Sequence, residues 1–270
     1  MTPERSKAAR DLLTFYAEAG VDAAIGEQAN DWLSGDRPAP AGKPDASAQP
    51  SPPPTPRPRA SSQAAMAPPP PAPDAAVMAA REAARGAQSL DKLRAILDRF
   101  DGCGLKASAS RLVFADGTPH SRVMLVGEAP GVEEDRQGLP FVGRSGQLLD
   151  RMLKAIGLDR SKVYIANIVP WRPPGNRTPT PIETQICLPF IQRQIELSDP
   201  DILVTVGQPS TGALLGVQGI TKHRGRWLPY HTGTREIRAM PMLHPAYLLR
   251  TPIAKRQAWR DMLAIKKALG

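Results

Sequence analysis

Short runs of apolar residues alternate with helical patterns in the second half of the chain. Four such runs read as buried strands, at 122–126, 163–169, 202–206 and 237–243. Between them, apolar residues recur at the three-four spacing of an amphipathic helix, as from Leu148 to Ile156 and from Ile182 to Ile195. Strands separated by helices are typical of a parallel sheet covered on both faces. We therefore predict a three-layer α/β/α fold with a central, mostly parallel, four-stranded sheet.

Further helices are predicted on either side of these strands. A short one includes Thr211–Leu215, and a C-terminal one starts near Pro252. Ahead of the first strand, Asp74 and Ser89 are residue types that cap helices, and the helix after Ser89 should run to about Phe100.

The beginning of the chain follows a different pattern. Residues 3–19 have a broad apolar stripe at helical spacing. Fourteen prolines lie between Pro38 and Pro73, where large apolar residues are nearly absent, so this stretch cannot bury enough surface to offset its ordering entropy. We expect a helical element at 1–35, a disordered linker at 36–73 and one folded domain at 74–270. The N-terminal helix is either a tail without function or a docking element for a partner protein.

The charge is concentrated in the region of strands and helices. The 270 residues carry a net charge of +9, but residues 1–100 hold 12 basic and 12 acidic side chains, so residues 101–270 carry the whole excess. Such a field attracts polyanions such as nucleic acid, although a solvated basic surface gives the same count. Two cysteines make no disulfide framework, and no apolar run is long enough to span a membrane. We expect a cytoplasmic, nucleoid-associated monomer.

Four polar or aromatic residues stand at or near strand ends. The signatures G-x-G-x-x-G, G-x-x-x-x-G-K-[ST], G-x-S-x-G and H-E-x-x-H are absent. Instead, the first strand runs into GEAPG, which contains Glu128, and Phe141 follows ten residues after this loop. Asn167 ends the second strand and His244 follows the last. Because ligands bind beyond the carboxyl ends of parallel strands, these four side chains could converge on one planar polar ligand.

Four segments together resemble a known family. GEAPG, GLPFVGRSGQLLD, NIVPWRPPGNRTPTP and HPAYLL, in this order, look like the family-four (type 4) branch of the uracil-DNA glycosylases, and the resemblance covers about residues 100–269. Each key residue alone also suits a purely structural role, but packing does not require all four segments in this order. The resemblance implies a monofunctional DNA glycosylase of base-excision repair, a hydrolase that releases uracil from DNA and leaves an abasic site. It also implies that residues 74–270 are the catalytic domain.

The resemblance also implies roles for the residues near the strand ends. Phe141 would stack on a flipped uracil, and Asn167 would read its O4 and N3–H edge. His244 would donate to uracil O2 as negative charge develops there. Glu128 would position or activate water, with Glu133, Glu134 and Asp135 as competing acids.

Other residues would complete the contacts with DNA. Gly127 and Ala129 would border the base, and Glu134 would exclude a 5-methyl group. Leu248 and Leu249 are candidates for a wedge that fills the gap in the duplex. The basic side chains that we expect to contact phosphate are Arg144, Arg172, Arg177, Lys222, Arg224, Arg226 and Arg250.

The sequence departs from the family at its metal centre. Family members hold an iron–sulfur cluster through four cysteines. Here Cys103 and Cys187 fit the second and fourth positions, whereas Phe100 and Trp171 stand at the first and third. We therefore expect no cluster and no other metal, with the two cysteines as remnants of the site.

Two other functions remain compatible with the sequence. Loss of the cluster could leave a non-catalytic reader of uracil or damaged bases in DNA. A changed pocket could also give a glycosylase with a shifted base preference, such as for hypoxanthine or xanthine.

Overall fold

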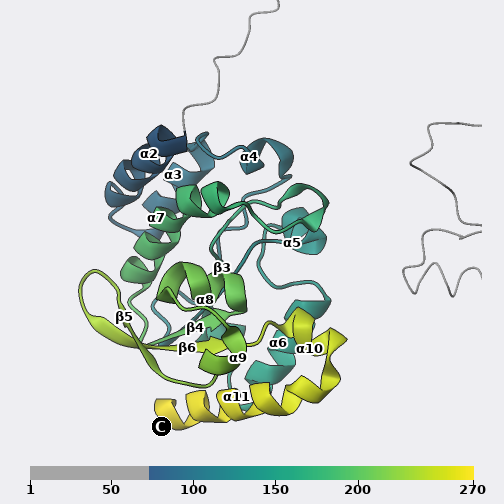
Figure 1. The fold of residues 1–270 in the computed structure, drawn as a ribbon. Helices are drawn as coiled ribbons and strands as arrows, with labels where there is room; N and C mark the ends of the chain where they lie inside the picture. Colours follow the sequence, from purple (N-terminus) through teal and green to yellow (C-terminus); the bar gives the residue numbers. More distant parts are fainter. Residues whose placement is uncertain (1–72) are drawn as a thin grey trace, which may run out of the picture. The chain divides into compact units, whose positions relative to one another are not determined.

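A computed structural model describes residues 73–270 (Figure 1). The predicted N-terminal helix at 3–19 and the linker up to residue 72 lie outside the described residues. Pro73, which we placed at the end of the linker, begins the first described helix, α2. Asp74 is therefore in the first turn of that helix and is not its N-cap.

A six-stranded mixed sheet forms the centre of the fold, in the order β1-β3-β2-β4-β6-β5. Its four inner strands are mutually parallel and correspond to the four predicted ones. They are β3 (Tyr164–Asn167), β2 (Val123–Gly127), β4 (Ile202–Val206) and β6 (Glu236–Met242). Parallel pairing aligns the carboxyl ends of these strands, and Gly127 is the register partner of Asn167.

The prediction of four strands is wrong at both edges of the sheet. β1 (Asp116–Gly117) and β5 (Leu228–His231) add antiparallel edge strands. β1 has only two residues, too few to show an alternating pattern. β5 contains Pro229, which is tolerated because an edge strand does not need every N–H for pairing.

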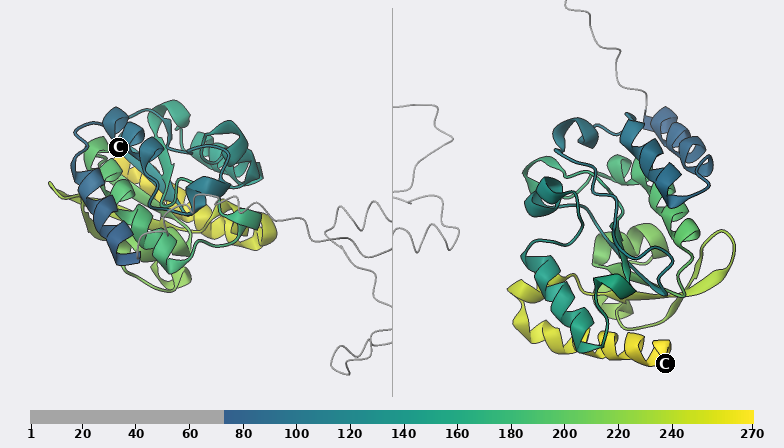
Figure 2. Two further views of the ribbon diagram at one scale, coloured as in Figure 1. Left: turned by 90° about the horizontal axis from the view of Figure 1, so that it is seen from above. Right: turned by 180° about the vertical axis from the view of Figure 1, so that it is seen from behind.

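Helices cover both faces of the sheet, as the sequence predicted (Figure 2). One face packs against α2 (Pro73–Arg85), α3 (Leu90–Arg99) and α7 (Pro181–Ser198), with α8 (Gln208–Leu215) on the same side. The other face packs against α6 (Arg144–Ala155) and α11 (Lys255–Leu269). In β2, Met124 and Leu125 point to opposite layers, and each buried side chain of this size contributes roughly 1.5–3 kcal/mol.

Several short helices were not predicted. They are α4 (Leu105–Ser108), α5 (Val132–Gln137), α9 (Ile220–His223) and α10 (Pro245–Arg250), with single 3₁₀ turns at Arg160–Lys162 and Pro174–Asn176. None is long enough to repeat an apolar stripe, so the helical period gives no signal. Of these, α5 and α10 matter most because they follow the loops after β2 and β6. The C-terminal helix predicted from near Pro252 begins with a 3₁₀ turn at Pro252–Ala254 and becomes α-helical at Lys255.

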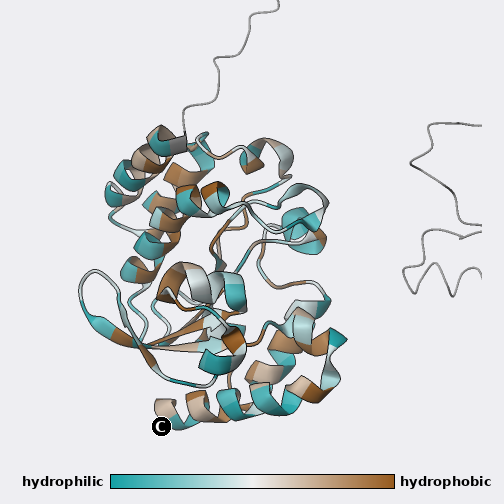
Figure 3. Ribbon diagram, viewed as in Figure 1, coloured by the Kyte–Doolittle hydropathy of each residue, from teal (hydrophilic) through white to brown (hydrophobic). Residues whose placement is uncertain are grey.

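One predicted helix cap is confirmed, and the structure adds a second. Ser89 is the N-cap of α3, where its hydroxyl accepts from Lys92 N at 3.2 Å. Thr180 and Glu183 form a capping box at the start of α7. Figure 3 shows apolar residues concentrated on the strands and on the helix sides that face them. None of the helices between residues 73 and 270 is long and apolar enough to cross a membrane.

Candidate active site

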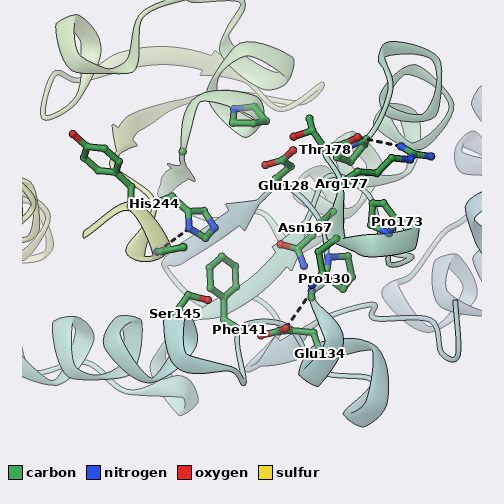
Figure 4. A pocket seen from close by; sticks show the side chains of 18 of the residues that line it. Glu128, Pro130, Glu134, Phe141, Ser145, Asn167, Pro173, Arg177, Thr178 and His244 are labelled. Atoms are coloured by element: carbon green, nitrogen blue, oxygen red, sulfur yellow. Dashed lines mark hydrogen bonds between the residues drawn. The ribbon is translucent and has the colours of Figure 1, made fainter. Parts of the chain in front are cut away.

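A cavity of about 640 Å³ lies at the carboxyl ends of the inner strands (Figure 4). The loops after β2, β3, β4 and β6 all contribute to its wall. Eight residues that we predicted for the site line it: Glu128, Ala129, Glu134, Phe141, Asn167, Arg177, His244 and Arg250. The fold therefore brings together the carboxylate, aromatic, amide and imidazole groups that are far apart in the sequence.

The ring of Phe141 packs closely over the end of β2. Phe141 is buried, and a Cβ atom built on Gly127 would lie 2.6 Å from its Cζ and 2.5 Å from Asn167 Oδ1. Only glycine therefore allows the ring and the amide to approach this strand end together. Gly127 does not line the cavity itself, but it determines where two lining side chains lie.

The backbone of Phe141 has an uncommon conformation. Its φ is +54°, in the left-handed region, which costs roughly 1–3 kcal/mol and persists only with support from the surroundings. Glu134 provides part of this support, because its Oε1 accepts from Val142 N at 3.0 Å and Gly143 N at 2.8 Å. Its Oε2 accepts from Gly131 N at 3.1 Å. The carboxylate thus joins the GEAPG loop to the loop that carries Phe141.

His244 is held as a neutral imidazole with a defined tautomer. Its Nδ1 accepts from Ala246 N at 3.1 Å as the N-cap of α10, so the ring proton belongs on Nε2. Burial, with a further contribution from the charge of Arg250, lowers the pKa of His244 to about 4. The ring can therefore donate a hydrogen bond from Nε2 at neutral pH without carrying a positive charge.

Glu128 has a carboxylate oxygen with no partner. Its Oε1 is buried, and no described residue hydrogen-bonds to it. Burial also raises the pKa of Glu128 from its ordinary value of 4.5. A buried acceptor without a protein partner needs a ligand or an ordered water, and a raised pKa suits a general base.

Asn167 presents a polar edge to the cavity from the end of β3. It is buried, and its side-chain amide makes no hydrogen bond with any residue in the described part of the chain. Both its donor and its acceptor are therefore available to a ligand. An amide in this position can match a partner that offers one acceptor beside one donor.

The structure adds lining residues that we did not predict. These are Pro130, Gly131, Ser145, Pro173, Asn176, Thr178, Pro179, Gly207, Gln208, Pro209, Ala246 and Tyr247. Gln208 was detectable, because it stands two residues after β4 and the rule that identified Asn167 and His244 applies to it equally. Ser145 and Tyr247 gave no such signal, since they belong to helices that the fold turns toward the cavity.

Of the two leucines predicted as a duplex wedge, one is buried and the other is exposed. The side chain of Leu248 is 1% exposed and packs with Leu243, Ala254 and Ala258, so it is a core residue. Leu249 is 38% exposed. Any wedge at this position must therefore use Leu249, and helical geometry explains the difference because successive residues of α10 point in different directions.

The arginines that we expected to contact phosphate differ in availability. Arg224 pairs with the buried Asp261 and donates to Gln257 O, so most of its donors are used within the protein. Arg177 makes a two-point ion pair with Glu183, at 2.7 and 2.8 Å, and still borders the cavity. Arg250 also lines the cavity. The other candidates lie outside its wall: Arg144, Arg172, Lys222 and Arg226.

The two cysteines meet in the protein core. Cys103 and Cys187 are both buried, and their Sγ atoms are 4.0 Å apart. The hydrogen bond that Cys187 donates to Cys103, together with burial, holds the pKa of Cys187 well above its ordinary value. Phe100 and Trp171, at the other two cluster positions of the family, belong to the same apolar cluster.

Comparison with known proteins identifies the family. Residues 114–263 match the family model described as the uracil DNA glycosylase superfamily. The type-4 uracil-DNA glycosylase of Sulfurisphaera tokodaii is 38% identical over 185 residues, which are 66% of this chain and 84% of that protein. That of Thermotoga maritima is 43% identical over 152 residues, 55% and 77% of the two chains. That of Saccharolobus solfataricus is 36% identical over 189 residues, 67% and 88% of the two chains.

These relatives contradict our expectation that the cluster is absent. They are type-4 uracil-DNA glycosylases, and resemblance to this branch implies an iron–sulfur cluster. The replacement of two cysteines does not by itself show that the cluster is absent. The local residues fit the group only in part. Cys103 and Cys187 offer two of the four thiolates, and residues 73–270 hold no group of three or more His, Cys, Asp or Glu side chains placed to bind a metal ion.

The family model covers β1 to β6 and every loop that lines the cavity. Each of the three relatives is matched over more than three quarters of its own length. The chain belongs to the uracil-DNA glycosylase superfamily, in its type-4 branch.

Proposed function

We propose that this protein hydrolyses the N-glycosidic bond of deoxyuridine in DNA, releasing uracil and leaving an abasic site for base-excision repair. The observation that carries the proposal is the convergence of Glu128, Phe141, Asn167 and His244 on one cavity. Membership of the type-4 branch supports the same reaction.

Recognition of the base depends on Phe141 and Asn167. A base inside a duplex must first leave the stack, which costs a few kcal/mol. The Phe141 ring then offers an apolar face on which the flipped base can stack, and the unpartnered Asn167 amide pairs with uracil O4 and N3–H. Cytosine has the reverse pattern of donor and acceptor at these positions. It leaves the buried amide unpaired, which is a strong source of rejection.

Cleavage separates charge between the sugar and the base. The bond from C1′ to uracil N1 breaks with its electron pair moving onto the uracil ring, while the sugar becomes oxocarbenium-like. The Nε2–H of neutral His244 donates to uracil O2 and stabilises the negative charge there. Glu128 accepts a proton from the water that attacks C1′. Its ionised carboxylate also stabilises the positive charge that develops on the sugar.

DNA would approach across the mouth of the cavity. Arg177 and Arg250 lie on its wall, and the exposed Tyr247 and Leu249 are on the neighbouring helix α10. Basic side chains of this kind neutralise phosphates, whereas exposed apolar ones can fill the gap left by a flipped base.

Release of free uracil from a duplex with one U:G pair tests the function. The wild-type protein should release uracil, and His244→Asn should lower the rate by about 100- to 1000-fold, because the shorter asparagine amide does not place a donor where His244 Nε2 lies. Asparagine is itself a good N-cap, so α10 should keep its start. His231→Gln is the matched control, since His231 is exposed and does not line the cavity.

The same assay separates the alternatives. Tight binding of the U:G duplex without release of uracil would indicate a non-catalytic reader. Release of hypoxanthine or xanthine in preference to uracil would indicate a shifted base preference. Equal rates for His244→Asn and the wild type would end the assignment of His244.

A further inference from the structure

Arg160, which lies behind the Phe141 loop, contacts the backbone of that loop directly. Its Nη1 donates to Pro140 O at 3.0 Å, and its Nη2 donates to Phe141 O. Arg160 begins the 3₁₀ turn Arg160–Lys162, which follows α6 and precedes β3. It does not line the cavity. Any effect on a ligand must therefore pass through the loop.

Two carboxylates fix the guanidinium in place. Arg160 Nε donates to Asp150 Oδ1 of α6 at 2.9 Å, and Nη1 pairs with Asp116 of β1. The Arg160 side chain is only 25% exposed. Because two acids neutralise its charge and four of its bonds end within the protein, it has little capacity left for a DNA phosphate.

The remaining contacts hold the same loop from other sides. Glu134 accepts from Val142 N and Gly143 N, the two main-chain donors that follow Phe141. Gly146 of α6 lies so close to the Phe141 carbonyl that a Cβ atom there would overlap it. Arg160 is the group that holds the carbonyl side. A left-handed φ at a bulky residue requires such support on every side.

We propose that Arg160 is a positioning residue for base recognition, which holds the Phe141 ring at the stacking face through the carbonyls of Pro140 and Phe141. This inference rests on the proposed function. It differs from a purely structural ion pair in one respect: the effect of Arg160 on the substrate must depend on the Phe141 ring.

A double-mutant cycle tests this dependence. Arg160→Gln removes the fork of donors, and Phe141→Ala removes the ring. With Phe141 present, Arg160→Gln should lower kcat/KM for uracil release about tenfold. In the Phe141→Ala background, the same change should cost less than about twofold. Arg160→Lys, which keeps the charge but has a single donor nitrogen and no planar fork, should recover part of the loss.

Binding is measured in parallel, with a duplex that contains 2′-fluoro-deoxyuridine. The fluorine disfavours the oxocarbenium-like state, so the duplex reports binding without cleavage. Arg160→Gln should weaken binding of this duplex more when Phe141 is present than in the Phe141→Ala background. Arg235→Gln is the matched control, because Arg235 also contacts two acids and two main-chain carbonyls, but at the far end of the sheet. It should leave kcat/KM unchanged even if it lowers the melting temperature.

The outcomes discriminate clearly. Equal losses from Arg160→Gln in both backgrounds, or an unchanged kcat/KM beside a lower melting temperature, would overturn the positioning role. If Arg160→Gln fails to fold, the double-mutant cycle is repeated with Arg160→Lys. Its loss in kcat/KM must again be larger with Phe141 present than in the Phe141→Ala background. A wild-type protein that binds the fluorinated duplex but releases no uracil would refute the proposed function. The affinities of the single and double variants for that duplex would still test the positioning role of Arg160.

Discussion

The imidazole of His244 faces the ring of Phe141, with the ring centroids 5.6 Å apart and the planes inclined by 28°. His244 comes from the loop after β6, and Phe141 comes from the loop between α5 and α6, which follows β2 in the chain. They adjoin because β2 and β6 are both parallel to β4. The donor proposed for uracil O2 and the ring proposed for stacking are therefore mechanically linked. A change that displaces either ring should affect both recognition and cleavage.

The pH dependence of the reaction should follow Glu128. Its carboxylate must be ionised to accept a proton, and burial raises its pKa above 4.5. We expect kcat/KM to rise with pH through this raised pKa and then reach a plateau. The rate should fall about tenfold per pH unit on the acid side. His244, with a pKa of about 4, should add no inflection at the ordinary histidine pKa.

Single-turnover rates from about pH 4 to about pH 9 measure this profile. Glu128→Gln should remove the acid limb and lower the plateau, because the amide cannot accept the proton. An acid limb that persists in Glu128→Gln would assign the titration to another group.

Asn167→Asp should harm uracil release more than Asn167→Ala. The aspartate keeps the shape of the side chain, but its negative charge faces uracil O4, whereas alanine leaves only a missing hydrogen-bond partner. We expect a loss of at least about 100-fold for aspartate. Rates on a uracil duplex, with melting temperatures of both variants, give the order. A faster aspartate variant would mean that Asn167 does not read the O4 edge.

Gly127→Ala should reduce kcat/KM by about 10- to 100-fold, because the added methyl group overlaps both the Phe141 ring and the Asn167 amide. Gly104→Ala is a matched control. Gly104 has an ordinary φ of −60°, and a Cβ atom there meets no atom within 4 Å. Steady-state kinetics on the same duplex compare the two. Equal activity of Gly127→Ala and the wild type would show that the ring and the amide need not approach this strand end.

Leu248 and Leu249 should separate stability from DNA binding. Leu248→Ala removes a buried side chain and should lower the free energy of unfolding by about 2–5 kcal/mol. Leu249→Ala should change it by less than about 0.5 kcal/mol but weaken binding of a uracil duplex. Denaturant unfolding and duplex affinity provide the two measurements. The wedge assignment fails if Leu249→Ala binds duplex as tightly as the wild type.

The long elements were predictable because their patterns repeat. β4 occupies the predicted residues 202–206, and α7 extends the predicted stripe by one residue at its start and three at its end. The edge strands β1 and β5 and the short helices α5 and α10 were missed. They contain too few residues to show a period, and their contacts with the rest of the fold stabilise them.

The candidate site also has features that the sequence could predict and features that it could not. Glu128, Asn167 and His244, which line the cavity, were predicted for the site because polar residues just after buried strands meet at one edge of a parallel sheet. The sequence could not indicate that Leu248 is buried while Leu249 is exposed, because both continue the same apolar run. Nor could it indicate Arg160, because its contacts with the Phe141 loop are to main-chain carbonyls and leave no side-chain motif.

The sequence alone determined the layer order of the fold, the chemical groups at the strand ends and the resemblance to the family, because these depend on local spacing and residue type. Tertiary structure decided the tautomer of His244, the partnerless oxygen of Glu128 and the left-handed backbone of Phe141. Each of these depends on which atoms surround a group after distant segments have packed. Burial, hydrogen bonding and strain have no counterpart in the order of residues along the chain.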